Sequence, residues 1–345
     1  MISAMIQKLV RRENLSFHEA RGVMTQIMDG EATAAQIGSL LTALRMKGET
    51  VEEITGCAQI MKAKACPFHT EYSALLDTCG TGGDGSGTFN ISTTVALVAA
   101  GAGVPVAKHG NRSVSSRCGS ADVLEALGVK IDLNPQEVEQ VLQETKIGFL
   151  YAPLFHRTMK HVIGPRREVG IRSIFNLLGP LTNPAGAKVQ VLGVYQPELT
   201  QVLAQVLDRL GVESAYVVHG AGGLDEISTL GSTKITFLHE GSIKNETIFP
   251  EDFGITRVTL KDIAGGDAHR NAEITKSVLE GQKGPCRDIV LLNSAAAFTV
   301  YGLARNLVQG MQIARESIDS GKAMEKLDQL IAATNQVRRQ EVMRA

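Results

Sequence analysis

The pattern of apolar and polar positions divides the chain into a helical N-terminal part and a longer mixed part. Residues 1–70 carry apolar side chains at helical spacing, and two Ser/Thr-x-x-Glu capping boxes begin at Ser16 and Thr50. Gly30 and Gly48 are typical of positions where helices end. Because no alternating strand pattern interrupts these residues, we predict a small, entirely helical lobe.

From Leu75 onward, short β-prone runs alternate with helical runs. This order is typical of an α/β lobe with a mainly parallel central sheet, which we assign to residues 71–345. Residues 160–185 lack strand alternation, so we expect a helical insert there that ends at Gly179-Pro180 and completes the helical lobe. The expected strands are Leu75–Cys79, Val104–Lys108, Val189–Tyr195, Ala215–His219 and Ile235–Leu238, and the expected helices include Ser92–Ala102, Ala121–Leu127, Leu199–Leu210 and the chain from about Asn271.

The composition indicates a packed globular protein of about two domains. The chain has 345 residues, of which 43% are hydrophobic and 35 are Gly. Lys and Arg number 35 and Asp and Glu 36, a balance that argues against a nucleic-acid or membrane-surface binder. The longest apolar run, 94–107, contains Gly and Pro and is too short to span a bilayer. Five scattered Cys without a C-x-x-C spacing indicate reduced thiols and a cytoplasmic protein.

Much of the Gly lies in a loop between a predicted strand and a predicted helix. Five of the eight residues from Gly80 to Gly87 are Gly, and Asn90 is the expected N-cap of the helix that follows. Backbone N–H groups exposed by Gly, together with a helix N-terminus, favour an anion-binding site over a surface turn. The hydroxyl groups that add donors here are those of Ser86, Thr88, Ser92 and Thr93.

A second strand-to-helix loop, residues 108–116, offers Lys, His, Asn, Arg and several Ser, with Ser120 beside the next helix. Lys108 and Arg112 would complement negative charge, although either residue alone is more often a solvated surface side chain. In open α/β sheets ligands bind at the carboxyl ends of the strands, where both loops are expected to lie. The two loops together therefore favour a phosphate-bearing ligand.

Two further pairs of charged residues are candidates for the same site. Adjacent helix residues point about 100° apart, so we expect one of Arg166 and Arg167 to face a site, where a guanidinium suits a carboxylate. Asp225 and Glu226 follow a predicted strand and a Gly-rich turn. Mg²⁺ commonly takes one or two carboxylates together with phosphate oxygens and water. For both pairs, a solvated surface remains the alternative interpretation.

Taken together, these segments resemble the anthranilate phosphoribosyltransferase family, whose motifs occur here in the family order over most of the chain. The related pyrimidine-nucleoside phosphorylases share the architecture but differ in the second loop, and they are the alternative enzyme. A non-catalytic, nucleic-acid-binding relative of this fold is the alternative from another class. The motifs are Gly80-Thr-Gly-Gly-Asp84, Asn90-Ile-Ser-Thr93, Lys108-His-Gly-Asn-Arg112, Gly119-Ser-Ala-Asp122, Asn176-Leu-Leu-Gly-Pro-Leu-Thr-Asn-Pro184 and Leu224-Asp-Glu226.

The resemblance implies transfer of the phosphoribosyl group of 5-phosphoribosyl-1-diphosphate to the amine of anthranilate, in tryptophan biosynthesis, by a nucleoside phosphorylase/phosphoribosyltransferase-like fold that forms a homodimer. It places anthranilate at Gly80, Asn111 and Arg166, and Mg²⁺ at Ser92, Asp225 and Glu226. The positions implied for phosphoribosyl diphosphate are Gly80, Gly83, Asp84, Thr88, Asn90, Ile91, Ser92, Thr93, Lys108, His109, Gly110, Asn111, Arg112, Ser113, Val114, Ser115, Ser116 and Ser120.

Lys108 and His109 are the expected catalytic residues, in positioning and electrostatic roles. Diphosphate carries several negative charges, so Mg²⁺ and Lys108 can stabilise the charge that develops as it leaves. An aromatic amine is uncharged at neutral pH, so we assign no obligate general base, and His109 is at most a hydrogen-bond donor that positions the substrate. Cys79 and Cys118 flank the two loops. We hypothesise that oxidation of these thiols slows the enzyme.

Overall fold

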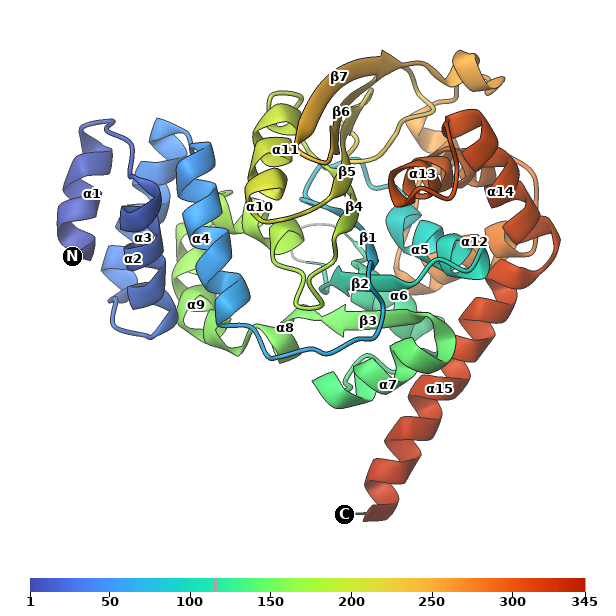
Figure 1. Cartoon of the computed structure of the whole chain (residues 1–345), viewed down its shortest axis with the longest axis horizontal. Helices are drawn as coiled ribbons and strands as arrows, with labels where there is room; N and C mark the ends of the chain where they lie inside the picture. The colour runs from blue at the N-terminus through green and yellow to red at the C-terminus, as the bar shows by residue number, and fades with distance from the viewer. Residues whose placement is uncertain (114–116, 345) are drawn as a thin grey trace.

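The computed structural model describes residues 1–113 and 117–344. Figure 1 shows a bundle of helices at one end, a sheet flanked by helices in the middle, and the C-terminal helix α15 (Lys322–Arg344), which extends away from the body. The predicted combination of a small helical lobe and a larger α/β lobe is confirmed. Within the described residues, no helix is both long and apolar enough to cross a membrane.

Four helices form the N-terminal part, and each predicted capping box is present. The Glu19 backbone N–H donates to the hydroxyl of Ser16, and the Glu53 N–H donates to that of Thr50, both over 3.3 Å. Helices α9 (Lys160–Val169) and α10 (Ile174–Leu181) pack against this bundle and share its apolar core. The four helices are α1 (Ile2–Val10), α2 (Phe17–Met28), α3 (Ala34–Lys47) and α4 (Val51–Ala63).

A seven-stranded sheet lies at the centre, in the order β3-β2-β1-β4-β5-β6-β7. The first five strands of that order run parallel, whereas β6 is antiparallel to β5 and β7 is antiparallel to β6. The sheet is therefore mainly parallel, as predicted. The strands are β1 (Leu76–Gly80), β2 (Val106–Gly110), β3 (Ile147–Tyr151), β4 (Val189–Gly193), β5 (Ser214–Gly220), β6 (Thr233–His239) and β7 (Ser242–Ile248).

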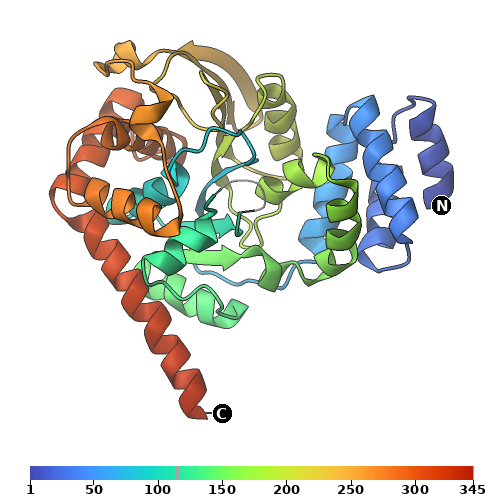
Figure 2. The same cartoon turned by 180° about the vertical axis from the view of Figure 1, so that it is seen from behind.

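Helices cover both faces of the sheet. On β5, Tyr216 and Val218 belong to one buried core, which α5, α13, α14 and α15 complete. Ala215 and Val217 point to the opposite face and join the core of α11 and the N-terminal helices. Figure 2 shows this two-sided arrangement from behind. The remaining helices are α5 (Ile91–Gly101), α6 (Ser120–Ala126), α7 (Pro135–Thr145), α8 (Ala152–Phe155), α11 (Leu199–Arg209), α12 (Ala268–Leu279), α13 (Pro285–Tyr301) and α14 (Leu307–Asp319), with 3₁₀ turns at Arg157–Met159, Pro250–Phe253 and Leu260–Ile263.

The structure differs from the predicted elements at three places. Strands β3 and β7 were not predicted. Strand β3 is a short, almost continuous apolar run, which periodicity alone does not distinguish from a buried helical segment. Strand β7 is a mostly exposed edge strand with polar side chains and has no clear apolar signal. Helix α10 does not end at Gly179-Pro180 but continues to Leu181. A Pro in the last turn removes only one backbone N–H, and the helix accommodates it close to its end.

The strand order brings several loops to one edge of the sheet. Strands β1 and β4 are parallel neighbours, and their last residues, Gly80 and Gly193, are paired. Strand β2 lies on the other side of β1, and β5 lies on the other side of β4. The loops that follow these four strands therefore leave the sheet side by side, which is where α/β proteins bind ligands.

Candidate active site

The Gly-rich loop after β1 rises from the sheet edge and leads directly into α5. The backbone has positive φ at Gly82, Gly83, Gly85 and Gly87, a conformation that side-chain-bearing residues rarely adopt. The Thr81 N–H donates to the carbonyl of the paired strand β4 at 2.9 Å, which anchors the start of the loop. The predicted combination of a strand, a Gly-rich loop and a helix N-terminus is thus present.

Asn90 stands at the N-cap position, as predicted, but its side chain does not cap the helix. Its Oδ1 accepts a hydrogen bond from Asn271 Nδ2 at 2.8 Å, and its Nδ2 donates to the Cys118 carbonyl at 3.3 Å. Asn90 therefore joins the start of α5 to the second loop and to α12. Of the first N–H groups of α5, that of Ile91 donates to the Phe89 carbonyl at 2.8 Å and that of Ser92 donates to Glu226 Oε1.

Asp225 and Glu226 converge on the Gly-rich loop and on the first turn of α5. The Gly82 N–H donates to Asp225 Oδ2 at 2.9 Å, and the Ser92 N–H donates to Glu226 Oε1 at 3.1 Å. The approach is so close that a Cβ on Gly80 would lie 2.3 Å from Asp225 Oδ2. Two carboxylates that are more than 130 residues away in the sequence from the groups they contact are thus held against the first loop and the start of α5.

These carboxylates are partly buried acids in a confined space. Burial, with the nearby negative charge of Asp84 as the next cause, raises the pKa of Asp225 to about 7. Burial also raises the pKa of Glu226 well above its usual range, with repulsion from Asp225 as the next cause. A cation between these groups would relieve both effects.

The donor chemistry fits a hard divalent cation such as Mg²⁺, which prefers carboxylate, hydroxyl, phosphate and water oxygens. Among the described residues, no group of three or more His, Cys, Asp and Glu side chains could hold a metal ion by itself. Asp225, Glu226 and the Ser92 hydroxyl would therefore supply part of a coordination shell that substrate and water complete.

Lys108 lies deep beneath this site rather than on a surface loop. Its side chain is buried, and its Nζ donates to the Thr78 carbonyl and, over 3.4 Å, to Ser92 Oγ. Burial lowers the pKa of Lys108, whereas the charges of Asp77 and Glu226 raise it. The ammonium group therefore faces the buried acids and the first turn of α5.

His109 is also buried, and its ring lies beside that of His156, with 5.1 Å between the centroids. Burial lowers the pKa of His109 to about 3 and that of His156 to about 4, so both imidazoles are neutral at pH 7. His109 Nδ1 lies 3.2 Å from the Gly179 carbonyl and must donate to it, which assigns the acceptor role to Nε2. Nε2 itself is buried and has no hydrogen-bond partner among the described residues.

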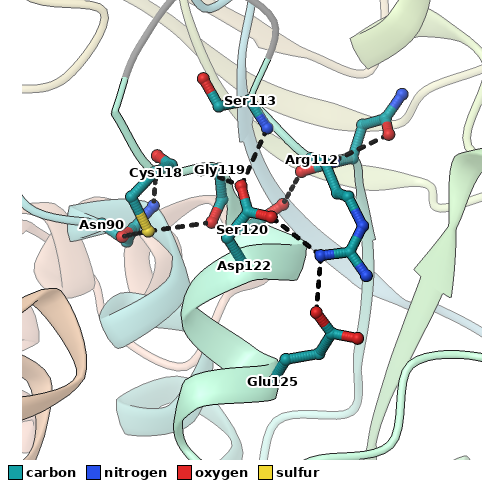
Figure 3. Close-up of polar contacts among 9 residues, drawn as sticks. Asn90, Arg112, Ser113, Cys118, Gly119, Ser120, Asp122 and Glu125 are labelled. Atoms are coloured by element: carbon teal, nitrogen blue, oxygen red, sulfur yellow. Dashed lines mark hydrogen bonds and ion pairs between the residues drawn. The ribbon is translucent and has the colours of Figure 1, made fainter. Parts of the chain in front are cut away.

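The second loop is organised by Asp122 on α6, as Figure 3 shows. Asp122 Oδ2 accepts from the Ser113 N–H at 3.0 Å and from the Gly119 N–H at 2.8 Å. The Ser120 hydroxyl donates to the Asn111 carbonyl at 3.3 Å. These bonds fold the described part of the loop back onto the start of α6.

Arg112 is already engaged in ion pairs within the protein. Its guanidinium forms ion pairs with Asp122 and Glu125 on α6, and it lies over the Tyr151 ring at 5.8 Å from the centroid. Two carboxylates therefore already compensate the charge that was expected to complement an anion. The Arg112 N–H, in contrast, donates to Asn111 Oδ1 at 2.7 Å, which leaves the Asn111 amide NH₂ as a donor for a ligand.

Arg166 lies on α9, over the ring of Phe175 at 5.3 Å from its centroid. It is half-buried, and burial lowers its pKa. Arg167, the next residue, is exposed, so the prediction that the two side chains point differently is confirmed. Among the described residues, no carboxylate pairs with Arg166.

The remaining predicted residues have mixed environments. The side chains of Ile91 and Thr93 are buried, so only their backbone can face a ligand. Thr88 lies within the first loop, 3.4 Å from the Ser86 hydroxyl. Three predicted positions, Val114, Ser115 and Ser116, lie outside the described residues.

The structure weakens the hypothesis that oxidation at two cysteines slows the enzyme. Burial raises the pKa of Cys118 to about 11 and raises that of Cys79 well above its usual range. Thiols react with oxidants as thiolates, so both side chains are poorly reactive at neutral pH.

Sequence reasoning missed several polar residues around the site. Asp77 in β1 is fully buried, accepts from Asn183 Nδ2 at 2.8 Å, and has a pKa that burial raises to about 6. An acidic residue inside an apolar strand is a signal that could have identified it. His156 and Arg172 carried no comparable signal, because their neighbours come from distant parts of the chain.

A groove of about 570 Å³ lies at a different place, beside the turn that precedes Asp225. Its lining includes His219, Lys234 and Glu246, and none of the predicted site residues. Most of the predicted residues lie instead in the loops that follow β1, β2 and β5, and Arg166 lies on α9.

Comparisons with known proteins agree with this arrangement. Residues 72–324 match the glycosyl transferase family a/b domain, and residues 3–65 match the helical bundle domain of the same family. The anthranilate phosphoribosyltransferase of Acetivibrio thermocellus is 55% identical over 335 residues, which cover 97% of both chains. The crystal structure of the enzyme from Thermus thermophilus superposes with a TM-score of 0.91 at 43% identity, covering 96% of this chain and 99% of that one.

The enzyme from Saccharomyces cerevisiae, in complex with phosphoribosyl diphosphate and Mg, has a TM-score of 0.89 at 30% identity, with 97% of this chain and 98% of that chain covered. These similarities favour the transferase over the phosphorylase and the nucleic-acid-binding relative. With the shared motifs, the shared domains and this degree of identity, the chain belongs to the anthranilate phosphoribosyltransferase family.

Proposed function

We propose that the site at the ends of β1, β2 and β4 transfers the phosphoribosyl group of 5-phosphoribosyl-1-diphosphate to the amine of anthranilate. The products are N-(5-phosphoribosyl)anthranilate and diphosphate, and the reaction belongs to tryptophan biosynthesis. The observation that carries this proposal is the convergence of Asp225 and Glu226 on the Gly-rich loop and on the first turn of α5. The family to which the chain belongs supports the same reaction.

The Gly-rich loop and the second loop are proposed to hold phosphoribosyl diphosphate. Support comes from the positive-φ glycines Gly83, Gly85 and Gly87, which expose backbone N–H groups close to the N-terminus of α5. Asp122 keeps the start of the second loop folded back on α6. The paired guanidinium of Arg112 makes it a weaker candidate than Lys108, so we expect the loop to bind mainly through its backbone and hydroxyl groups.

Arg166 is proposed to bind the carboxylate of anthranilate. A half-buried guanidinium without a carboxylate partner among the described residues is well suited to an anionic ligand, and its planar fork matches a carboxylate. Phe175 fixes the plane of the guanidinium. The Asn111 amide and the close approach at Gly80 are proposed as further contacts.

Mg²⁺ is proposed at Ser92, Asp225 and Glu226. The yeast relative was solved with phosphoribosyl diphosphate and Mg, and the donor set here is of the kind that Mg²⁺ prefers. When bound, the ion would neutralise charge on the diphosphate oxygens as the bond to ribose C1 breaks. Variants Asp225→Asn and Glu226→Gln, combined, should lower Mg²⁺-dependent turnover by at least about a hundredfold. Activity equal to the parent at every Mg²⁺ concentration would remove this proposal.

The protein's own groups are suited to positioning rather than proton transfer. Positive charge develops at ribose C1 as diphosphate leaves, as in glycoside cleavage. Lys108, buried beside Ser92, adds positive charge under the phosphate-binding loop. His109 is neutral and its Nε2 is buried, so we propose at most a positioning role for it and no role as an obligate base.

A fluorescence assay tests the proposed reaction. Purified protein is mixed with anthranilate, phosphoribosyl diphosphate and Mg²⁺, and the decrease of anthranilate fluorescence is followed. Reactions without Mg²⁺ or without phosphoribosyl diphosphate serve as controls. Phosphate-dependent cleavage of thymidine or uridine is measured in parallel. Absence of transfer by well-folded protein, or cleavage of a nucleoside instead, would contradict the proposal.

We also propose the organisation of the molecule in solution. Residues 1–70 with 160–185 form the helical lobe, residues 71–345 form the α/β lobe, and two copies associate through the helical lobe. Exposed apolar side chains on that lobe, including Val10, Met46 and Ile163, support this interface. The absence of a disulfide among the five Cys, all of which lie in the described residues, supports a cytoplasmic protein. Analytical ultracentrifugation of the parent and of Val10→Asp tests the dimer, because a monomeric parent would refute it.

A further inference from the structure

Arg172 occupies a position that links the helical insert to the phosphate-binding loop. It lies between α9 and α10, and its guanidinium carbon stands 4.1 Å from the centroid of the Tyr195 ring, in the turn after β4. The other side of the guanidinium approaches the Gly-rich loop. A Cβ on Gly83 would lie only 3.0 Å from Arg172 Nη2 and 3.5 Å from Cζ. The planar group is therefore held between the loops that follow β1 and β4.

The charge of this guanidinium is not compensated within the protein. Among residues 1–113 and 117–338, no carboxylate and no carbonyl oxygen pairs with Arg172, although the side chain is only partly exposed. Arg112 shows the contrasting case, since two carboxylates on α6 hold it. The five N–H donors of Arg172 thus stand beside a Gly-rich loop without an acceptor.

We propose that Arg172 is a further binding residue for phosphoribosyl diphosphate, placing its N–H groups on phosphate oxygens held by the Gly-rich loop. This inference rests on the function proposed above. Three features of the structure support it: Tyr195 holds the plane of the guanidinium, Gly83 allows it to approach the loop backbone, and no competing anion neutralises it. A guanidinium fork matches two oxygens of one phosphate, which an ammonium cannot do.

In this proposal Arg166 and Arg172 bind different anionic ligands. Arg166 rests on Phe175, within the helical insert, whereas Arg172 contacts two segments of the α/β lobe. The first is therefore placed for anthranilate and the second for phosphate. Binding of phosphate at Arg172 also ties the helical insert to the Gly-rich loop.

Direct binding without anthranilate tests this inference. Calorimetric titration with phosphoribosyl diphosphate and Mg²⁺, and separately with inorganic diphosphate and Mg²⁺, gives Kd for the parent and for three variants. Arg172→Gln should raise both Kd values at least about tenfold, and Arg172→Lys should lie between it and the parent. Arg167→Gln is the matched control, because Arg167 is exposed on the same segment, and its Kd values should stay within about twofold of the parent.

Steady-state kinetics and chemical rescue separate binding from a structural role. Arg172→Gln should raise KM for phosphoribosyl diphosphate about tenfold or more, with KM for anthranilate within about twofold of the parent. In Arg172→Ala, a few millimolar guanidinium ion should restore part of the lost affinity, which it would not do for a misfolded variant. Melting temperatures of all variants are recorded alongside.

The outcomes distinguish this inference from the proposed function. Unchanged Kd values in Arg172→Gln, or an increase confined to KM for anthranilate, would overturn the role of Arg172 and leave the proposed function intact. A parent that binds phosphoribosyl diphosphate but transfers nothing to anthranilate would overturn the proposed function, while the Kd comparison would still decide the role of Arg172. A parent that does not bind phosphoribosyl diphosphate would overturn both.

Discussion

Substituting Gly80 by Ala should displace a proposed metal ligand without unfolding the protein. A Cβ at this position would lie 2.3 Å from Asp225 Oδ2 and 2.9 Å from its Cγ, whereas ordinary van der Waals contact begins near 3.4 Å. The Asp225 carboxylate must therefore move by about 1 Å. The clash involves the end of a side chain, so the backbone can remain in place while the carboxylate turns away.

The expected loss can be estimated from this displacement. A misplacement of about 1 Å costs on the order of a hundredfold in rate when positioning matters, which corresponds to about 2.7 kcal/mol. We therefore expect kcat/KM to fall about a hundredfold in Gly80→Ala, and the Mg²⁺ concentration for half-maximal activity to rise. At Gly193 a Cβ would lie 1.5 Å from the Asp225 backbone carbonyl, so Gly193→Ala must shift the backbone and should also cost about 1–3 kcal/mol of stability.

Anthranilate fluorescence at a series of Mg²⁺ concentrations, together with thermal unfolding, measures these effects. Gly164→Ala is the control, because no atom lies within 4 Å of its added Cβ and the residue is helical. It should retain parental kcat/KM, and because Pro165 follows it, any change in stability should stay within about 1 kcal/mol. If Gly80→Ala kept kcat/KM within about threefold of the parent with the same Mg²⁺ dependence, the carboxylate position would not matter and the reasoning would fail.

Three further predictions concern other parts of the molecule. Arg166→Ala should raise KM for anthranilate about 10- to 100-fold and leave KM for phosphoribosyl diphosphate within about twofold; equal increases would sink the assignment. Glu53→Ala leaves the buried ammonium of Lys47 without the carboxylate that lies 2.9 Å from it. Urea unfolding should therefore show that the free energy of unfolding falls by about 3–5 kcal/mol. A decrease below about 1 kcal/mol would refute this prediction. Burial lowers the pKa of His109 to about 3 and of His156 to about 4, so the unfolded chain binds more protons below pH 6.5 and stability should fall as the pH falls from 6.5 toward 4. Melting temperatures between pH 7 and 5 check this trend, and His156→Gln should show a shallower fall than the parent.

Features that depend on residues close together in the sequence could be predicted from the sequence. The capping boxes at Ser16 and Thr50 combine a side chain with a backbone N–H three residues away, and both are present. The Gly-rich loop was recognisable because strand, loop and helix follow one another in the chain. Four of its glycines, Gly82, Gly83, Gly85 and Gly87, have positive φ.

Features that depend on packing between distant parts of the chain could not be predicted from the sequence in the same way. The edge strand β7 is mostly exposed and polar, so its place in the sheet follows from hydrogen bonding to β6 rather than from an apolar pattern. Lys108 is buried, and His109 is neutral because it is buried too, and both facts depend on how distant parts of the chain pack around these residues. A sequence motif identifies which side chains belong to a site, but burial decides their charge.

The arginines of the site illustrate why residue type and motif do not determine a role. Arg112 stands in a motif rich in phosphate-compatible groups, yet Asp122 and Glu125, about one helical turn apart on α6, take its charge. Arg172 belongs to no motif used for recognition, yet it is stacked on Tyr195 with no carboxylate in contact among the described residues. The free energy available for binding an anion depends on the acceptors that a cation already has, because a paired guanidinium must first give up those contacts. A cation without such partners is therefore the better candidate for a substrate phosphate, even when the sequence around it is unremarkable.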